Sequence, residues 1–512
     1  MPMLPAVPIG TTARTTLALA LLAASLGTGC AMPLQFPAAP LSIQETPDGR
    51  VRSYAVTHPG KPDYFATENA DGRTVRVAYD PMGEGKPTTF VNLDEIRLPG
   101  CRHVVIVLDG MPYDVVEAYR KKGGLRLFYP PSRMIPPYPA FTDLSLSDAF
   151  ASARCFAFEA VHFDHHLNKI VGGDSDYLSM KNESWARECD YRADTLYDAL
   201  SYLRPEPVFQ KELADVAKLL DQHDRNVVIL YLVSTAGLAT REGEAGEIKI
   251  IEAIDRFCEE LVWRTRGLVK FTLFSDHGHT MQTCRRIDFK SFLTGKGWRV
   301  SDHLEKPRDV VLVEYGLVTN AIFCTKDRPA LAGDLAQCKG VRFTCYEDGA
   351  AIAVRAANGS AAIERRGDSF RYRAAEGDPL QLLPVFEKLK GEGKLDADGF
   401  AADRVLFDAT ATHVYPDACE RLWRGFHGLV EEVPDVIADI DRGYFAGMES
   451  RANMVGGTIA STHGDLERVS STAVLISTAG PLPPVLRVRD LPKAMQALTG
   501  QPWPPPRETR GK

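Results

Sequence analysis

Two apolar runs in the sequence end in side chains that can bind a metal ion. In "RHVVIVLDG" the apolar run is followed by Asp109, and in "VKFTLFSDHGH" it is followed by Asp276, His277 and His279. Carboxylate and imidazole groups are the usual ligands of zinc and similar divalent ions. In an open α/β sheet, ligands bind at the carboxyl ends of the strands. We therefore expect Asp109, Asp276 and His277 to meet at one sheet edge, although an Asp-Gly pair is also a common turn.

A threonine follows the first of these runs in a setting that allows two interpretations. In "MIPPYPAFTDLSLSDAF" the prolines favour an extended approach, and Thr142 then opens a helical pattern. Thr142 can be an ordinary helix cap. Alternatively, its hydroxyl lies beside the free N–H groups of a helix start, which favour a phosphate group. A nearby metal ion would lower the pKa of the hydroxyl and make it a nucleophile.

The elements that must position these residues alternate between strands and helices. "RHVVIVLDG", "RNVVILYLVS" and "VKFTLFSD" are continuous apolar runs, and each neighbours a helical pattern such as "EIKIIEAIDRFCEELVWRTR". This alternation predicts the α/β class, with a mostly parallel central sheet and helices on both faces. A shift to short strands and turns after about residue 325 predicts a small β-containing insertion or lid.

The sequence divides into six expected regions. These are a signal peptide (1–30), a tether with a small β extension (31–100), the first part of the core (101–325), the insertion (326–400), the second part of the core (401–490), and a C-terminal helix with a polar tail (491–512).

The N-terminal region predicts export. Arg14 precedes "TTLALALLAASLGTGC", an apolar segment that is short for a membrane span and ends in small residues before Cys30. This pattern is typical of a bacterial lipoprotein signal, in which Cys30 becomes the lipidated first residue. Ordinary cleavage and an uncleaved anchor are the alternatives. We therefore expect a periplasmic protein or a membrane-anchored lipoprotein.

Composition narrows the function classes. The chain has 512 residues, 45% of them hydrophobic, and a net charge of −7, which disfavours a general nucleic-acid binder. Nine of the ten cysteines follow Cys30, and none forms a CxxC pair. They are either buried apolar residues or disulfide partners, and the sequence leaves both alternatives open.

Four motifs, taken in order, resemble a known family. Asp109 after the first strand, Thr142 after "PYPAF", "SDHG" at 275–278 and "THGD" around His463 resemble the alkaline phosphatase superfamily. The most similar branch is the nucleotide pyrophosphatase/type I phosphodiesterase group. The resemblance covers roughly residues 100–480.

The resemblance implies a two-metal site, usually with zinc, around a Ser or Thr nucleophile. It implies that Asp109, Thr142, Asp276 and His277 hold one metal, and that His463 serves the other. An asparagine after the nucleophile commonly binds a phosphate oxygen in this family, and its best match is Asn168 in "HFDHHLNKIVGG". No cysteine stands at the nucleophile position, which makes a sulfatase a weaker expectation.

The sequence departs from the family at the second metal. An Asp and a His four residues apart are expected after "NVVILYLVS", but "STAGLATREGE" has Ala236 and Thr240 there. A shifted register offers only Ser234 and Leu238. One metal site is therefore expected to be intact and the other to be degenerate. Glu242, Glu244 or a histidine of "HFDHH" remain alternative ligands, against their interpretation as surface polar groups.

Two functions follow as expectations. The first is an exported metal-dependent hydrolase of phosphoric esters that takes a small phosphodiester or nucleotide-type substrate and no nucleic-acid polymer. Its membrane contact would be a lipid on Cys30. The second is an impaired or inactive binding or scaffold protein on the same fold, because Ala236 and Thr240 replace two ligands. A purely structural outer-membrane lipoprotein would explain the N-terminus but not the motifs.

Overall fold

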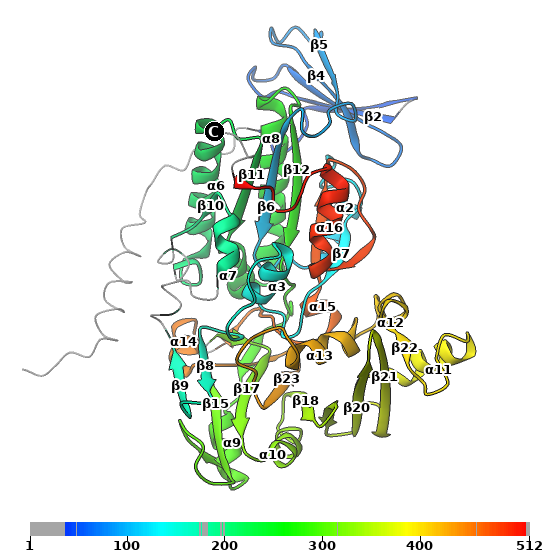
Figure 1. Ribbon diagram of the computed structural model, residues 1–512. Helices are drawn as coiled ribbons and strands as arrows, with labels where there is room; N and C mark the ends of the chain where they lie inside the picture. The colour runs from blue at the N-terminus through cyan, green and yellow to red at the C-terminus, as the bar shows by residue number, and fades with distance from the viewer. Residues whose placement is uncertain are drawn as a thin grey trace, which may run out of the picture.

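The computed structural model describes residues 36–507, apart from Asp48, 174–175, 177–182, 195–196, 198–199, Tyr315 and Gly457. The expected signal segment with Cys30, and residues 508–512 of the tail, lie outside the described residues. Figure 1 shows three parts of the molecule: an N-terminal sheet (blue) at the top, a central sheet flanked by helices, and a second large sheet at the bottom.

The central sheet has seven strands in the order β10-β11-β6-β12-β26-β7-β27. The four strands from β10 to β12 run parallel, β26 runs antiparallel to β12 and to β7, and β27 runs parallel to β7. Their bounds are β10 Tyr191–Arg192, β11 Val227–Leu232, β6 Arg102–Leu108, β12 Val269–Ser275, β26 Ala473–Ser477, β7 Ser132–Ile135 and β27 Val485–Arg487.

Helices cover both faces of this sheet. Alternate residues of β6 point to opposite sides and are apolar on both, so both faces must be covered. Val104, Ile106 and Leu108 belong to one apolar cluster with residues of α2, α6 and α8, whereas Val105 and Val107 belong to another with α3 and α16. The bounds are α2 Tyr113–Lys121, α3 Thr142–Ala149, α6 Pro205–Gln222, α7 Ser234–Glu242, α8 Glu244–Arg264 and α16 Leu491–Thr499.

The N-terminal sheet is a five-stranded antiparallel meander. Its strands are β1 Ser42–Thr46, β2 Gly49–Tyr54, β3 Tyr64–Glu68, β4 Thr74–Tyr79 and β5 Thr89–Asn92. It is attached to the core by polar contacts, because Tyr79 donates its hydroxyl hydrogen to Val262 O (3.0 Å) and Lys270 donates to Leu93 O (2.8 Å).

The second large sheet has nine strands and is antiparallel except between β14 and β15. Its strands, in spatial order, are β14 Arg299–Val300, β15 Asp309–Val313, β17 Asn320–Thr325, β23 Val436–Ile440, β18 Val341–Asp348, β19 Ala351–Ala356, β20 Gly359–Arg366, β21 Ser369–Glu376 and β22 Ala401–Ala402. The helices of this part are α9 Phe289–Gly295, α10 Arg328–Leu335, α11 Leu383–Gly391, α12 Asp403–Thr410 and α13 Ala418–Phe426.

Smaller elements complete the described fold. A four-stranded sheet contains β16 Leu317–Val318, β24 Tyr444–Gly447, β13 Cys284–Arg286 and β25 Thr458–Ile459, and a hairpin contains β8 Val161–Asp164 and β9 Lys169–Gly172. The short helices are η1 Ser184–Glu188, α14 Glu449–Met454, α15 Arg468–Ser471 and η2 Val488–Asp490.

Two expectations about the architecture need correction. The α/β class is confirmed, but one mostly parallel central sheet does not describe the fold, because most strand pairings in the described sheets are antiparallel. The β insertion is also larger than 326–400, since its sheet begins at Arg299 and includes β23. The strands "DVVLV" and "VIADI" are buried at every position, as the central strand β12 is. Their sequence pattern therefore does not show that they belong to a second sheet.

The cysteines act as buried apolar residues in the described part of the chain. Nine of them, from Cys101 to Cys419, are buried free thiols. The disulfide alternative therefore fails for these nine, and Cys30 lies outside the described residues. No helix within the described residues combines the length and apolar character that crossing a membrane requires.

Candidate active site

The carboxyl ends of β6 and β12 bring three predicted ligands together. Leu108, the last residue of β6, pairs in parallel register with Ser275, the last residue of β12. Asp109, Asp276 and His277 follow these positions, and one ligand atom from each lies within 4.8 Å of the others. His277 Nε2 is 3.2 Å from Asp276 Oδ2 and 3.6 Å from Asp109 Oδ1. The sheet edge therefore concentrates two carboxylates and an imidazole in a buried group.

Hydrogen bonds orient both carboxylates. Asp276 Oδ1 accepts from the backbone N–H groups of Gly110 (2.9 Å) and His277 (3.0 Å), and Tyr231 donates its hydroxyl hydrogen to Asp109 Oδ2 (2.6 Å). Burial raises the pKa of Asp276, against the bond from Gly110, which lowers it. Tyr231 stands near the end of the apolar run "VVILYL", where its hydroxyl is the one polar side-chain group, so the sequence held a signal for it.

The group fits a divalent metal ion. His277 Nδ1 lies 3.0 Å from the carbonyl oxygen of Gly278, and a carbonyl can only accept, so Nδ1 carries the proton. The lone pair of Nε2 then faces the two carboxylates, as in histidines that ligate metals. Burial lowers the pKa of His277 to about 4, which keeps the ring neutral at neutral pH. Asp276 Oδ2 is buried without a hydrogen-bond donor, which also suits a ligand atom.

Thr142 does not cap its helix. It is the first residue of α3, the cap position belongs to Phe141, and no side chain caps this end. The Thr142 hydroxyl instead lies 3.2 Å from His277 Nε2, and the residue is only partly buried. The hydroxyl therefore borders the Asp109/Asp276/His277 group.

Two further histidines extend the site. The His463 ring stacks on His277 at 3.7 Å between centroids and an interplanar angle of 10°, and its Nδ1 lies 3.0 Å from Ala140 O. That carbonyl leaves the Nε2 lone pair of His463 free for a ligand role. The His279 ring lies 5.3 Å from His463 and is fully buried. His279 is visible in the sequence, in "SDHGH", but its position there did not assign it to either predicted metal.

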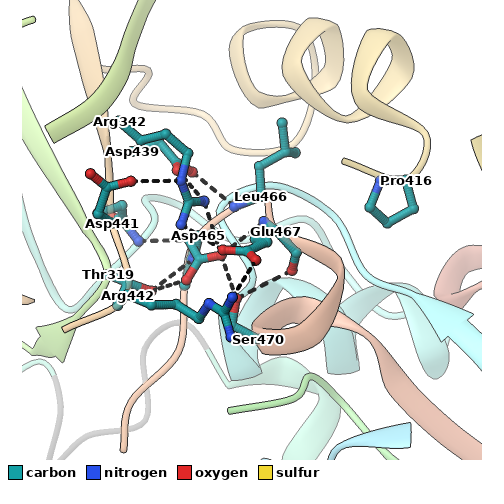
Figure 2. A network of polar contacts seen from close by, with 12 residues as sticks. Thr319, Arg342, Pro416, Asp439, Asp441, Arg442, Asp465, Leu466, Glu467 and Ser470 are labelled. Carbon is teal, nitrogen blue, oxygen red and sulfur yellow. Dashed lines mark hydrogen bonds and ion pairs between the residues drawn. The ribbon is translucent and has the colours of Figure 1, made fainter. Parts of the chain in front are cut away.

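The loop that carries His463 is held by a network of polar side chains (Figure 2). Thr319 donates its backbone N–H to His463 O (2.7 Å) and its hydroxyl hydrogen to Asp465 (2.7 Å). Arg342 donates to Asp439 (2.9 Å) and lies 3.6 Å from Asp465. Pairing with an arginine compensates the burial of these carboxylates. The network therefore positions the "THGD" segment against the rest of the site.

The degenerate segment forms α7 and supplies no replacement at the expected positions. Ala236 and Thr240 are both buried, and neither carries a carboxylate or an imidazole. Ser234 donates its hydroxyl hydrogen to Glu212, so the shifted register does not restore a ligand either. Glu242 forms an ion pair with Lys249 at 2.7 Å. Glu244, at the start of α8, is exposed.

The "HFDHH" segment lies in the β8–β9 hairpin. His165 forms a separate group of possible ligands with Cys324 and Asp435, whose ligand atoms lie within 4.8 Å of one another. Asp435 already pairs with Arg328 at 2.8 Å, which opposes a cation at this place. Among the described contacts of His165, none reaches the Asp109/Asp276/His277 group.

No described contact brings Asn168 to Thr142. It occupies the turn between β8 and β9 at φ 49°, and both ends of its amide bond the backbone of Leu304. Nδ2 donates to Leu304 O (3.3 Å), and Oδ1 accepts from Leu304 N (2.8 Å). These bonds fix the hairpin turn, and a phosphate-binding role for Asn168 stays a prediction.

A buried acid on α8 interacts electrostatically with Asp109. Glu247 is fully buried, and neither carboxylate oxygen has a hydrogen-bond partner among the described residues. Burial raises the pKa of Glu247 well above its usual range, and repulsion from Asp109 raises it further. The signal in the sequence was an acid on the apolar helix face that continues at Ile250, Ile251 and Ile254.

Comparisons with known proteins find likenesses among solved structures alone. No model of a known protein family matches the sequence, and no curated protein matches it. Among solved structures, murine ectonucleotide pyrophosphatase/phosphodiesterase 5 is similar to this chain, with 11% identity and a TM-score of 0.43. The match covers 79% of this chain and 96% of that chain.

Proposed function

We propose that the protein is a metal-dependent hydrolase of phosphoric esters of the alkaline phosphatase type, with Thr142 as its nucleophile. The observation that carries this proposal is the position of the Thr142 hydroxyl. It has no capping role in α3 and lies 3.2 Å from His277 Nε2, beside the buried Asp109/Asp276/His277 group. The motif order in the sequence supports the same chemistry. The expected substrate is a small phosphodiester or a nucleotide.

The roles of the residues follow from their chemistry. Asp109, Asp276 and His277 would hold a divalent ion such as zinc, which acts as a Lewis acid toward a phosphoryl oxygen. Thr142 Oγ1 gives its proton to solvent and forms a bond to phosphorus, while the bond from phosphorus to the leaving oxygen breaks and that oxygen takes up a proton from solvent. The first N–H groups of α3 favour the negative phosphoryl oxygens. Water then hydrolyses the phosphothreonyl ester, which regenerates the Thr142 hydroxyl and releases the phosphomonoester.

Turnover of bis(4-nitrophenyl) phosphate by zinc-supplied protein tests this proposal. We expect release of 4-nitrophenol that chelation abolishes and zinc restores. Thr142→Ala should lower the rate by at least about 1,000-fold, the scale for losing several kcal/mol of catalysis. Thr142→Ser keeps a hydroxyl and serves as the matched control. Equal turnover by wild type and Thr142→Ala would refute the role of Thr142.

A binding or scaffold protein is the second candidate, and Ala236 and Thr240 support it. A site with one metal can hold a phosphorylated ligand without turning it over, because the second ion ordinarily stabilises the attacking or leaving oxygen. Calorimetric titration with a nucleoside monophosphate distinguishes the two candidates. Zinc-dependent binding without turnover of any phosphodiester supports this second function.

Export is part of the proposal. The segment 1–30 has the composition of a signal peptide that ends at Cys30. Expression of the full-length chain in a bacterium, followed by fractionation and intact mass measurement, tests it. A mature chain that begins at Cys30 and carries lipid supports a membrane-anchored lipoprotein. An unprocessed chain in the cytosol contradicts export.

A further inference from the structure

The helix α13 contacts two segments that carry side chains of the candidate site. Figure 1 shows α13 (orange) between the central sheet and the nine-stranded sheet. One segment is the approach to Thr142 through "PPYPAF", and the other is the loop that carries His463. A single side chain of α13, Arg421, forms hydrogen bonds with both segments.

Arg421 donates these hydrogen bonds to main-chain carbonyls. Its Nη1 donates to Leu466 O (3.0 Å), shortly after His463 in the chain. Its Nη2 donates to Pro137 O (3.4 Å), shortly before Thr142. The guanidinium is planar and rigid, so the positions of its two nitrogens are fixed relative to each other. Arg421 therefore fixes the distance between the two segments.

The guanidinium of Arg421 is buried and charged. The residue is 1% exposed, and Nη1 also donates to Pro416 O (3.4 Å), just before α13; Pro416 and Leu466 are labelled in Figure 2. Burial lowers the pKa of Arg421 to about 10, against carboxylates such as Asp417 and Asp465, which raise it. The group therefore keeps its charge at neutral pH, and hydrogen bonds from a charged donor are stronger than those from a neutral one.

Two further contacts hold the segment of Thr142 on α13. A Cβ on Gly425 would lie 2.9 Å from Tyr138 O, so the glycine lets the helix approach the chain closely at this point. At the last turn of α3, Arg424 donates to both carboxylate oxygens of Asp148, with Nη2 2.5 Å from Oδ1. α13 thus contacts the chain on both sides of Thr142.

The segments of Thr142 and His463 also bind each other. Ala140 N donates to Gly464 O (3.2 Å), and Ala140 O lies 3.0 Å from His463 Nδ1. Arg421 bonds each of the two segments at a second point. A shift of either segment would move the Thr142 hydroxyl relative to His463, and the bonds from Arg421 oppose such a shift.

We propose that Arg421 is a positioning residue for the proposed reaction, and that it sets the place of Thr142 relative to His463. The inference rests on the proposed function, because it concerns the geometry of that reaction. The hydrogen bonds of Arg421 go to the main chain, so it acts through the two segments. A misplacement of reacting groups by about 1 Å can cost about 100-fold in rate.

Arg421→Lys tests this inference and keeps the positive charge. An ammonium group donates from one nitrogen, whereas the guanidinium reaches Leu466 and Pro137 from two. With bis(4-nitrophenyl) phosphate and zinc, we expect kcat to fall by about 100-fold while KM stays near the wild-type value. The zinc content should equal that of wild type, because Arg421 bonds none of the proposed ligands.

Hydrogen exchange followed by mass spectrometry tests the same inference without activity. The amide of Ala140 donates to Gly464 O, and the amide of Leu466 donates to Asp439 (2.8 Å). Both amides should exchange faster in Arg421→Lys than in wild type. The amides of β6 and β12, which carry the proposed metal ligands at their ends, should keep their rates.

The matched control is Arg73→Lys. Arg73 is 8% exposed, and its two terminal nitrogens donate to Asp94 (2.8 and 2.7 Å) beside the N-terminal sheet. The control makes the same chemical change at another buried arginine, and it should keep kcat and the exchange rates of both segments. Circular dichroism shows whether each variant folds. If Arg421→Lys does not fold, Arg421→Gln replaces it, because an uncharged side chain is less costly to bury.

The outcomes separate this inference from the proposed function. Wild-type kcat in a folded Arg421 variant overturns the inference, and so do wild-type exchange rates in both segments. A loss of zinc from the variant, or an equal loss of kcat in Arg73→Lys, also overturns it, because the effect is then not confined to the two segments. If wild type has no turnover, the proposed function fails, and exchange alone decides: faster exchange at Ala140 and Leu466 supports the positioning, and unchanged exchange overturns it.

Discussion

Replacement of Asp276 by Asn separates the folding role of this side chain from the metal-binding role that we propose for it. Asp276 Oδ1 accepts two backbone hydrogen bonds, from Gly110 and His277, and the amide oxygen of Asn can accept both. The amide nitrogen would then stand where Oδ2 faces His277 Nε2 at 3.2 Å, and it could donate to that lone pair. The substitution also removes one of two buried carboxylates. The metal-free variant should therefore be as stable as wild type, or more stable.

The metal-bound state responds in the opposite direction. Loss of a partner that only orients a ligand already costs 10- to 100-fold in metal affinity, so loss of the ligand itself should cost at least about 100-fold. At a free zinc concentration of 100 times the wild-type Kd, zinc stabilises wild type by about 2.7 kcal/mol. Most of this stabilisation should disappear in Asp276→Asn.

Thermal unfolding with chelator and with zinc measures both effects, and a chelator competition gives the affinities directly. We expect a zinc-dependent rise of Tm in wild type and a much smaller rise in Asp276→Asn, from the same or a higher metal-free Tm. An equal rise in both proteins would refute the assignment of Asp276 as a ligand. A large loss of stability in the metal-free variant would refute the hydrogen-bond argument.

Three further predictions concern single features. Thr142→Ala should leave the start of α3 intact by circular dichroism while it abolishes phosphodiester turnover; a melted helix with retained turnover would contradict this. Ala236→Asp combined with Thr240→His should raise turnover, and a folded variant with no gain would count against the alignment there. Burial lowers the pKa of His103 from 6.5 to about 4, so folding disfavours its proton. The free energy of unfolding is therefore unaffected by His103 above pH 6.5, and it decreases by up to about 3 kcal/mol as the pH falls toward 4. His103→Gln should flatten this part of the pH–stability curve, and an unchanged curve would contradict the prediction.

The strands that position the site could be predicted because their patterns are local. Long apolar runs identified β6, β11 and β12, and the rule that ligands gather at the carboxyl ends of strands brought Asp109, Asp276 and His277 together. The extent of the second sheet could not be predicted in the same way. The strands β15, β17 and β23 have the same buried pattern as central strands, and only their tertiary partners assign them to another sheet.

The features of the site that depend on tertiary contacts could not be predicted from the sequence. Whether Thr142 caps α3 depends on side-chain direction, and in the structure the hydroxyl faces His277. Glu247 stands on α8, the helix that follows α7, and no pattern in the sequence indicated that it interacts electrostatically with Asp109. Asn168 was assigned by its place after the predicted nucleophile, whereas the β8–β9 turn directs its amide to Leu304.

The most direct test of the central claim is the location of the metal next to Thr142. Crystals grown from zinc-supplied protein, with diffraction data collected at the zinc absorption edge, give this location by anomalous scattering. We predict a peak between Asp109, Asp276 and His277, within reach of the Thr142 hydroxyl. Anomalous density confined to the His165/Cys324/Asp435 group, or no peak at the sheet edge in zinc-saturated crystals, would contradict the account.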